Sequence, residues 1–270
     1  MKKIRLDVLV TDRGLFDSRE KAKRAIMAGI VLIKGQIMDK PGTEVPEDVE
    51  IIIKENPNKY VSRGGLKLEK AMQLYDIHLD QKVCMDIGAS TGGFTDCMLK
   101  SGASKVFSVD VGYGQLDYSL RTNPLVTNME RTNIRHVTLE QIGTKLDFVS
   151  IDVSFISLKL VLPVAMSLMA DQSEIVFLIK PQFEAGREQV GKNGVIRDSK
   201  VHVQVLKSIT TFAEEIGFIL KALTFSPIRG PKGNIEFLCY AQKNVNYDES
   251  IERFMPNIEA LVDKAHIEAI

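Results

Sequence analysis

The sequence is poor in cysteine, has no long apolar run and carries no excess of charge of either sign. Its three cysteines, Cys84, Cys97 and Cys239, are odd in number and far apart, which argues against a disulfide framework or a cysteine metal site. The four histidines are equally scattered, so we expect no metal. No run reaches the ~18 apolar residues that a membrane-spanning helix needs, and no signal-peptide core follows Met1. We therefore expect a cytoplasmic protein without membrane insertion.

Charge is balanced overall but unevenly distributed. The chain has 35 Lys+Arg and 35 Asp+Glu in 270 residues, so no global field indicates nucleic acid or membrane. Residues 1–34 nevertheless hold nine basic and four acidic side chains, a net of +5, whereas residues 35–60 hold three and six, a net of −3. A basic N-terminal face is consistent with nucleic-acid binding, and an ordinary solvated helix face is the alternative.

The segment 83–94 predicts a strand, a tight turn and a helix. Apolar residues lead into Asp86, a glycine-rich loop follows, and an amphipathic run begins at Phe94. Such a loop gathers backbone N–H groups at a helix start and leaves room for a ligand. A second strand, ending in Asp110, follows about 20 residues later, where a carboxylate can accept the hydroxyls of a ribose. The pattern indicates a nucleoside-containing cofactor.

The same loop argues against a dinucleotide or a nucleoside triphosphate. The Gly-x-Gly-x-x-Gly pattern lacks its middle glycine because Ser90 stands there, and no Gly-Lys-Ser/Thr closes a phosphate-binding loop. Asp86 would repel a pyrophosphate. S-adenosylmethionine, with an amino-acid end, a ribose and a positive charge, fits better. The alternative is a glycine-rich turn without a ligand, which would leave two strand-end carboxylates without partners at an energetic cost.

Residues 1–55 form the first predicted domain, followed by a linker at 56–62. Leu6–Leu9 suggest a short helix, Asp17-Ser18 can cap a second helix that ends near Gly29, and alternation at 31–33 and 49–53 indicates strands. Basic residues lie at helical spacing on the second helix, where they could hold a phosphate backbone without reading bases.

This region resembles the RNA-binding domain named after ribosomal protein S-four. The matching stretches are Arg-Leu-Asp at 5–7, Ser-Arg at 18–19, Gly-Ile-Val-x-Ile-x-Gly at 29–35 and Lys-Pro-Gly at 40–42. In that family the second helix contacts structured RNA. The expected RNA-binding residues are Arg5, Arg19, Lys23, Arg24 and, beyond this domain, Arg63.

Residues 63–245 predict a doubly wound α/β domain of Rossmann type with a mostly parallel sheet. Apolar or β-branched runs at 83–87, 106–110, 147–152, 175–180 and 235–241 are expected strands, and they alternate with helical patterns such as 157–169 and 201–216. Residues 246–270 carry apolar residues at helical spacing, including Ile251, and predict a terminal helix packed on this domain.

Four charged residues outside the loop stand at element boundaries: Lys67, Asp152, Lys180 and Glu236. In open α/β sheets, function gathers at the carboxyl ends of strands. Lys180 follows an apolar strand and precedes a proline. Burial and a second cation nearby would favour a neutral amine there, which could take a proton from a sugar hydroxyl. A buried ion pair or a capped turn is the alternative for each residue taken singly.

The motifs at these positions resemble the TlyA family, which joins an S-four-type domain to a 2′-O-ribose methyltransferase domain of FtsJ type. They include Ser-Arg-Gly-Gly-Leu-Lys at 62–67, Asp-Ile-Gly-Ala-Ser-Thr-Gly-Gly-Phe at 86–94, Lys-Pro-Gln-Phe-Glu at 180–184 and Gly-Asn-Ile-Glu-Phe at 233–237. The resemblance implies a Lys-Asp-Lys-Glu catalytic tetrad on the four residues above, S-adenosylmethionine as donor, and ribosomal RNA in ribosomal subunits, at cytidine, as acceptor. The implied cofactor-binding residues are Asp86, Gly88, Ala89, Ser90, Gly92, Gly93, Phe94, Asp110, Val111, Met129 and Glu130.

Two other functions remain open from the sequence. Proteins of this family have carried the label haemolysin, so a membrane-active protein is one alternative, and an RNA-binding protein with an inactive methyltransferase fold is another. The glycine-flanked polar loop at 191–198 is either a lid over RNA or a plain connection.

Overall fold

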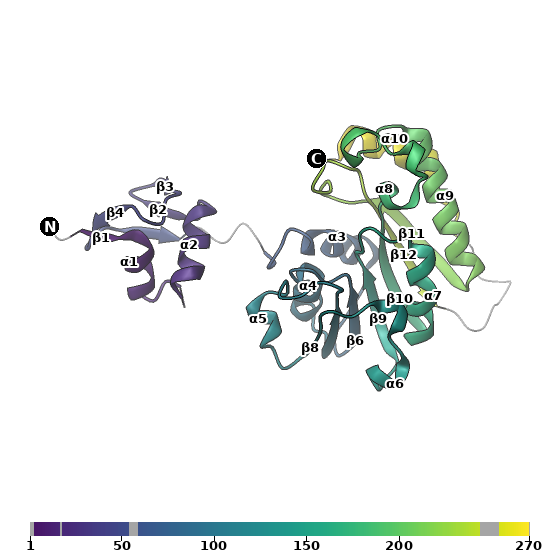
Figure 1. Cartoon of the computed structure of the whole chain (residues 1–270), viewed down its shortest axis with the longest axis horizontal. Helices are drawn as coiled ribbons and strands as arrows, with labels where there is room; N and C mark the ends of the chain where they lie inside the picture. Colours follow the sequence, from purple (N-terminus) through teal and green to yellow (C-terminus); the bar gives the residue numbers. More distant parts are fainter. Residues whose placement is uncertain (1–2, 17, 54–58, 244–253, 270) are drawn as a thin grey trace. The chain divides into compact units, whose positions relative to one another are not determined.

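A computed structural model describes residues 3–16, 18–53, 59–243 and 254–269 of the chain. It divides into two compact units, residues 1–59 and 60–270 (Figure 1). Tyr60 is buried in the core of the second unit, and the Val61 N–H donates to Asp96 Oδ2 at 2.9 Å. The second unit is therefore already packed at Tyr60. Residues 56–58 of the expected linker, with 54–55 before them, lie outside the described residues.

The first unit packs two helices against small sheets. Helix α1 (Leu6–Asp12) and helix α2 (Arg19–Met27) bury Leu6, Val10 and Ile26. The Ser18 hydroxyl caps α2 by accepting from the Lys21 N–H; Asp17, the other expected cap, lies outside the described residues. Strand β2 (Val31–Ile33) pairs with β3 (Gln36–Met38) and β5 (Ile51–Ile53), and β1 (Lys3–Arg5) pairs with β4 (Glu44–Pro46).

A seven-stranded sheet, in the order β11-β12-β10-β9-β6-β7-β8, forms the centre of the second unit. Five neighbouring strands are parallel, and β12 runs antiparallel to both β10 and β11. The strands are β6 (Val83–Ile87), β7 (Lys105–Val109), β8 (Val126–Met129), β9 (Leu146–Ile151), β10 (Met169–Ile179), β11 (Phe218–Phe225) and β12 (Phe237–Lys243). The doubly wound fold predicted from the sequence is confirmed.

Helices cover both faces of this sheet, so each central strand is apolar on both sides. Along β10, Phe177 and Ile179 face the core that contains α7 and α9, whereas Val176 and Leu178 face the core of α3 and α4. These helices are labelled in Figure 1. The helices are α3 (Gly65–Tyr75), α4 (Gly93–Lys100), α5 (Tyr118–Arg121), α6 (Leu139–Ile142), α7 (Leu158–Leu168), α8 (Pro181–Glu184), α9 (Ser199–Glu215) and α10 (Ile258–Glu268).

Two strands of the seven-stranded sheet are absent from the sequence prediction. Strand β8, Val-Thr-Asn-Met, has no fully buried residue, and β11, Phe-Ile-Leu-Lys-Ala-Leu-Thr-Phe, carries a lysine in an apolar run. Both are edge strands. An edge strand is covered on fewer sides, so its hydrophobic signal is weaker than that of a central strand.

The described part of the C-terminal segment is α10, which packs against α9 and β11. It buries Ile258, Val262 and Ala265 in the core on the α7 and α9 side. Ile251, which the sequence pattern assigns to this helix, lies outside the described residues.

Candidate functional site

The carboxyl ends of the parallel strands meet at one edge of the sheet, on both sides of β6. The chain runs from β6 to β7 and β8 on one side and then returns to β9 and β10 on the other. This reversal is the topological switch point at which α/β sheets bind ligands. Asp152 directly follows β9 and Lys180 directly follows β10, so both side chains emerge at this edge.

The four boundary residues come together in one ion-pair network. Lys67 Nζ lies 2.7 Å from Glu236 Oε2 and 3.3 Å from Asp152 Oδ2. Lys180 Nζ lies 2.5 Å from Asp152 Oδ1 and donates to Ser154 Oγ at 3.1 Å. Asp152 therefore joins the two lysines, and we call this group the tetrad.

Different elements bring the tetrad together. Lys67 stands in the first turn of α3, and Glu236 immediately precedes β12. Because β12 is antiparallel to β10, with Phe237 paired to Ile179, β12 begins at the edge where β10 ends. A lysine on a helix and a glutamate before a late strand thus reach the same point as two residues at parallel strand ends.

Burial makes the tetrad charges interdependent. Lys67, Lys180 and Glu236 are each less than one-tenth exposed. Burial alone would lower the pKa of Lys67, but Asp152 and Glu236 overcome that effect and raise it. Burial alone would raise the pKa of Asp152, but the two lysines overcome that effect and lower it. Two carboxylates therefore surround the Lys67 ammonium group and favour its charged form.

A cavity of about 460 Å³ adjoins both the tetrad and the glycine-rich loop after β6. Its size is typical of a small-molecule site. All four tetrad residues line it, together with Ser62, Gly64, Asp86, Gly88, Ala89, Ser90, Thr91, Gly93 and Phe94. The sequence-predicted loop and the sequence-predicted tetrad therefore form walls of a single cavity.

The loop after β6 turns through left-handed backbone conformations. Gly88, Ser90 and Gly92 have φ values of 86°, 49° and 93°. A Cβ on Gly88 would lie 2.6 Å from the backbone oxygen of Asp152, so only glycine fits there without a shift. Ser90, which replaces the middle glycine, adopts the conformation that glycine would take. Its N–H is held by Asp110 Oδ2 at 2.8 Å.

Asp86 is buried and fully engaged by the chain itself. Its Oδ2 accepts from the Thr95 N–H at 2.9 Å and from Thr95 Oγ1 at 2.7 Å, and its Oδ1 accepts from Ser150 Oγ at 3.4 Å. Burial raises the pKa of Asp86 to about 7. The argument that this carboxylate needs a ligand as partner is therefore wrong, although Asp86 still lines the cavity.

The other predicted cofactor residues lie outside the lining of this cavity. Asp110 Oδ1 accepts from the Gly112 N–H at 2.7 Å, so both of its oxygens have backbone partners. Glu130 accepts from the Gln115 N–H at 2.8 Å. Desolvation alone would raise the pKa of Glu130, but hydrogen bonds from Asn128, Leu116 and Gln115 outweigh it and lower that pKa. Asp110 thus joins the loops that follow β6 and β7, and Glu130, which directly follows β8, holds the loop that follows β7. Val111 is exposed, whereas Met129 is half-buried at the end of β8 and Gly92 is buried where α4 begins.

The sequence analysis missed an aromatic pair at the cavity. Phe155 is 90% exposed and has a φ of 64°, in the left-handed region that a bulky residue rarely adopts. Its ring lies 4.8 Å from that of Phe183, and both line the cavity. An aromatic residue after the strand-end sequence Asp-Val-Ser is the only sequence signal. An exposed ring at a cavity offers a surface on which a base could stack.

The loop at 191–198 is fastened to the segment before β12 through one amide. Asn234 Nδ2 donates to the Gly194 oxygen at 2.8 Å, and Asn234 Oδ1 accepts from the Ile196 N–H at 3.0 Å. Asn234 is buried. Gly194 lines the cavity, so the loop forms part of its wall as well as a connection.

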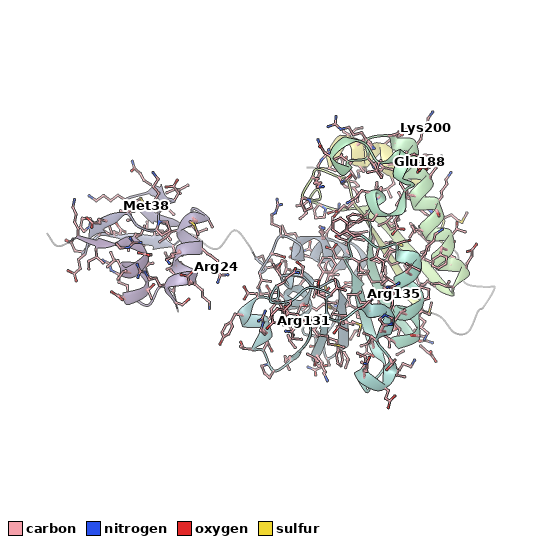
Figure 2. The ribbon with its side chains drawn as sticks, in the orientation of Figure 1. Arg24, Met38, Arg131, Arg135, Glu188 and Lys200 are labelled. Atoms are coloured by element: carbon pink, nitrogen blue, oxygen red, sulfur yellow. The ribbon has the colours of Figure 1, made fainter. Side chains whose placement is uncertain are left out.

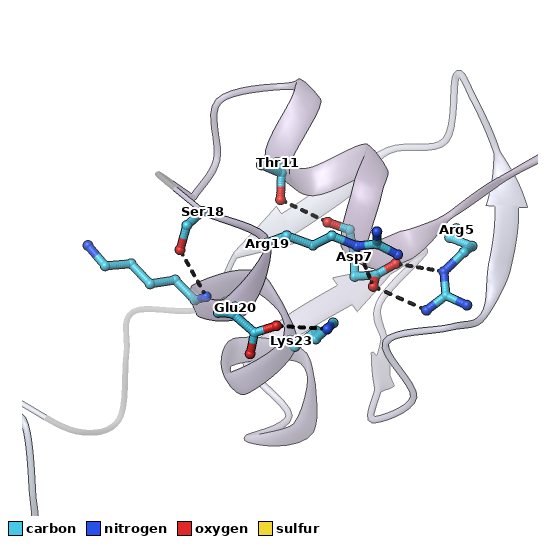
Figure 3. Close-up of polar contacts among 8 residues, drawn as sticks. Arg5, Asp7, Thr11, Ser18, Arg19, Glu20 and Lys23 are labelled. Atoms are coloured by element: carbon cyan, nitrogen blue, oxygen red, sulfur yellow. Dashed lines mark hydrogen bonds and ion pairs between the residues drawn. The ribbon is translucent and has the colours of Figure 1, made fainter. Parts of the chain in front are cut away.

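In the first unit, a buried carboxylate holds two of the predicted RNA-binding residues (Figure 3). Asp7 is fully buried; Arg5 donates to its two oxygens, both at 3.1 Å, and Arg19 donates to Oδ2 at 3.0 Å. Both arginine side chains are about half exposed. Asp7 therefore fixes two guanidinium groups side by side at the surface. The sequence analysis did not assign it a role.

The other predicted RNA-binding residues are held less firmly. Lys23 pairs with Glu20 at 2.8 Å on the exposed side of α2. Arg24 extends from α2 and is exposed (Figure 2). Arg63, in the second unit, is exposed and does not line the cavity, although its neighbours Ser62 and Gly64 do.

Residues 3–16, 18–53, 59–243 and 254–269 contain neither a membrane-spanning helix nor a metal-ion cluster. No helix there has the length and apolar composition to cross a membrane. Nor does any group of three or more His, Cys, Asp or Glu side chains in those ranges come together as a metal-ion site.

Comparisons with known proteins agree with this architecture. The family model of FtsJ-like methyltransferases matches residues 60–243, and that of the S4 domain matches residues 4–51. The chain is 50% identical over 266 residues, 98% of its length and 95% of the relative's, to a Bacillus subtilis protein named "Putative rRNA methyltransferase YqxC". It is 40% identical over 240 residues, 88% of its length and 90% of the relative's, to "16S/23S rRNA (cytidine-2'-O)-methyltransferase TlyA" of Mycobacterium tuberculosis.

A solved structure described as a "Putative hemolysin from Streptococcus thermophilus" has a TM-score of 0.75 and 46% sequence identity, and the match covers 99% of this chain and 97% of that one. The family model covers well over half of the chain, and the resemblance found in the sequence is confirmed. The chain therefore belongs to the FtsJ-like methyltransferases, in the TlyA-type group that carries an S4 domain ahead of the methyltransferase domain.

Proposed function

We propose that this enzyme methylates the 2′-hydroxyl of a ribose, at cytidine, in ribosomal RNA, with S-adenosylmethionine as the donor. The observation that carries the proposal is the tetrad Lys67, Asp152, Lys180 and Glu236 in the wall of the cavity that the 88–94 loop also lines. The relatives named as rRNA methyltransferases, two of them at cytidine 2′-oxygens, support the substrate. With such a substrate, we expect the reaction in the cytoplasm.

The residues of the loop fit the proposed donor. Gly88 lets the loop pass close to the backbone of Asp152, and the cavity that the loop lines is of ligand size. Asp86 would face the amino-acid end, where a carboxylate complements an ammonium group. Asp110, Val111, Met129 and Glu130 are proposed for the ribose and adenine end, beside the loops that they brace. When bound, S-adenosylmethionine supplies an electrophilic methyl group on its sulfonium.

The tetrad would hold and polarise the acceptor. Lys180, ion-paired with Asp152, would donate to the ribose 2′-oxygen and stabilise the negative charge that develops as the hydroxyl proton passes to solvent water. Asp152 would keep the Lys180 ammonium in place, and the pair of Lys67 with Glu236 would fix Asp152 in turn. Most of the rate enhancement in this arrangement comes from positioning. Phe155, exposed at the cavity, would stack on an unstacked base of the target region.

The test is transfer of tritiated methyl groups to purified small and large ribosomal subunits, followed by mapping of methylated riboses in rRNA from cells with and without the protein. We expect label on a cytidine 2′-oxygen and the loss of that modification in cells without the protein. Cofactor binding without transfer to any rRNA would instead favour an inactive fold. Leakage from liposomes treated with the purified protein would support the membrane-active alternative.

We expect the affinity for S-adenosylmethionine to rise with pH through about 7. Burial raises the pKa of Asp86 to about 7, so this side chain is neutral below that pH and a carboxylate above it. Only the carboxylate attracts the ligand's ammonium group, and the gain is about tenfold for one charge-assisted contact. Titration calorimetry between pH 5.5 and 7.5 measures it. The Asp86→Asn variant shows how much of the pH dependence comes from ionisation of the ligand itself. If affinity rises equally with pH in both proteins, Asp86 does not face the ammonium group.

We expect Asp7→Asn to weaken RNA binding even though it removes a negative charge. Asp7 fixes Arg5 and Arg19, so its loss frees both guanidinium groups and destabilises the first unit by about 1–3 kcal/mol. Filter binding to rRNA and urea unfolding measure the two effects. Glu20→Gln is the matched control, because it removes the same charge from an exposed ion pair that contributes little to stability. Tighter RNA binding by both variants would leave Asp7 without a positioning role.

A further inference from the structure

A second cavity, of about 440 Å³, lies beside the 191–198 loop. Its walls come from that loop, from the segment before β12 and from α10. The lining residues are Val195, Ile196, Arg197, Arg229, Lys232, Gly233, Ile235 and His266. None of the predicted site residues belongs to this group.

The polar side chains of this cavity are all basic. Arg197, Arg229 and Lys232 are exposed cations that line it, and His266 supplies a ring nitrogen donor or acceptor nearby. No carboxylate is among the lining residues. Within the described ranges, no ion pair involves any of the three cations. Like charges gathered around one cavity repel each other, and a bound anion relieves that repulsion.

The framework that presents these charges is fixed. Arg229 Nε donates to the Ala269 oxygen and its Nη1 to the Gly233 oxygen, both at 3.1 Å, which orients the guanidinium. Two hydrogen bonds of the Asn234 side-chain amide hold the backbone next to Arg197 to the segment that carries Lys232. His266 Nε2 lies 2.9 Å from His202 Nδ1. The cations are therefore attached to a braced wall rather than to a free loop.

This cavity adjoins the tetrad cavity. Lys232 lines both, and its Nζ lies 3.7 Å from where a Cβ on Gly194 would stand, in the wall of the tetrad cavity. A polynucleotide whose ribose reaches the tetrad has further phosphates on either side of that nucleotide. One of these phosphates can enter the second cavity, which shares the Lys232 wall with the tetrad cavity.

We propose that the second cavity binds a backbone phosphate of the RNA, next to the nucleotide that is methylated. The inference rests on the proposed function, which supplies the polynucleotide. Arginine suits this role because its planar guanidinium donates two parallel hydrogen bonds to phosphate oxygens. A contact of this kind fixes the register of the RNA and reads no sequence.

The test is the Arg197→Gln variant, assayed for methyl transfer to ribosomal subunits and for RNA binding over a range of salt. We expect KM for RNA to rise about tenfold, with kcat and cofactor affinity unchanged, because one charge-assisted contact is lost. The plot of log affinity against log salt should also lose about 0.7 of slope, as expected for one phosphate contact.

Lys200→Gln is the matched control. Lys200 is exposed near the start of α9 and lines neither cavity, and its substitution removes the same charge three residues away (Figure 2). If Arg197→Gln and Lys200→Gln give the same KM and the same slope, the phosphate site is refuted, even with an active wild type. If the wild type methylates no rRNA, the proposed function falls instead. Inorganic phosphate that binds the wild type while RNA affinity is unchanged in Arg197→Gln would assign the cavity to a free anion and overturn the RNA contact.

Discussion

The Lys180→Ala variant is expected to lose methyl transfer by at least about 10²–10³-fold while it still binds S-adenosylmethionine. The estimate is the usual cost of removing one donor that faces a developing negative charge. Lys180 Nζ contacts Asp152 and Ser154, and both lie in the cavity wall. Single-turnover transfer of tritiated methyl groups to ribosomal subunits measures the loss, and calorimetry measures cofactor binding.

The variant is expected to stay folded, which makes the result interpretable. Without Lys180, Asp152 keeps a cation, because Lys67 Nζ remains 3.3 Å from its other oxygen. Lys221→Ala is the control for loss of a lysine, since Lys221 is exposed on the edge strand β11. Turnover like that of the wild type in Lys180→Ala would remove this lysine from the mechanism.

The four residues of the tetrad could be selected from the sequence because each stands at or near an element boundary. Asp152 and Lys180 each follow an apolar run, and parallel strands end at one edge of a sheet. Glu236 precedes a strand whose antiparallel direction, paired with β10, follows only from the sheet order. Lys67 stands near the expected start of a helix, and its role, like that of the other three, is implied by the family resemblance. The contacts themselves, and Asp152 as the link between two lysines, required coordinates.

The sequence predicts the position of the loop after β6 but not the hydrogen bonds of its carboxylates. Periodicity and glycine content reveal a turn, yet they do not show which donors reach a carboxylate. Thr95 and Ser150 are ordinary positions in a helix and a strand, and they supply the partners of Asp86. The Ser90 amide similarly holds Asp110. A carboxylate at a strand end is therefore not by itself evidence of a missing ligand.

Contacts that depend on distant segments were not predictable at all. Asn234 bonds to residues about 40 positions earlier in the chain, and no local pattern marks it. The basic cavity combines a loop, a segment before a strand and a terminal helix, so its three cations are unrelated in sequence. The role of Asp7 was equally unpredictable, because a buried carboxylate between two arginines leaves no periodic pattern in the sequence.

The pair of Lys67 and Glu236 allows a stabilising role to be separated from a catalytic one. Glu236 is 2% exposed, so Lys67→Met leaves a buried carboxylate without its cation at 2.7 Å. We expect this single change to reduce the free energy of unfolding by about 3–5 kcal/mol. The double variant Lys67→Met/Glu236→Leu removes both charges, and apolar replacements of a buried pair are often neutral, so we expect stability within about 1–2 kcal/mol of the wild type. Urea unfolding measures both.

The same double variant should remain inactive despite its recovered stability. Asp152 would keep Lys180 but would lose the Lys67 ammonium that holds its second oxygen, so the group that positions Lys180 would no longer be fixed. Recovery of folding without recovery of methyl transfer assigns the Lys67–Glu236 pair to the reaction. Recovery of both would reduce the pair to packing and leave Asp152 and Lys180 to act alone. A double variant as unstable as the single one would show instead that the buried carboxylate is not what destabilises Lys67→Met.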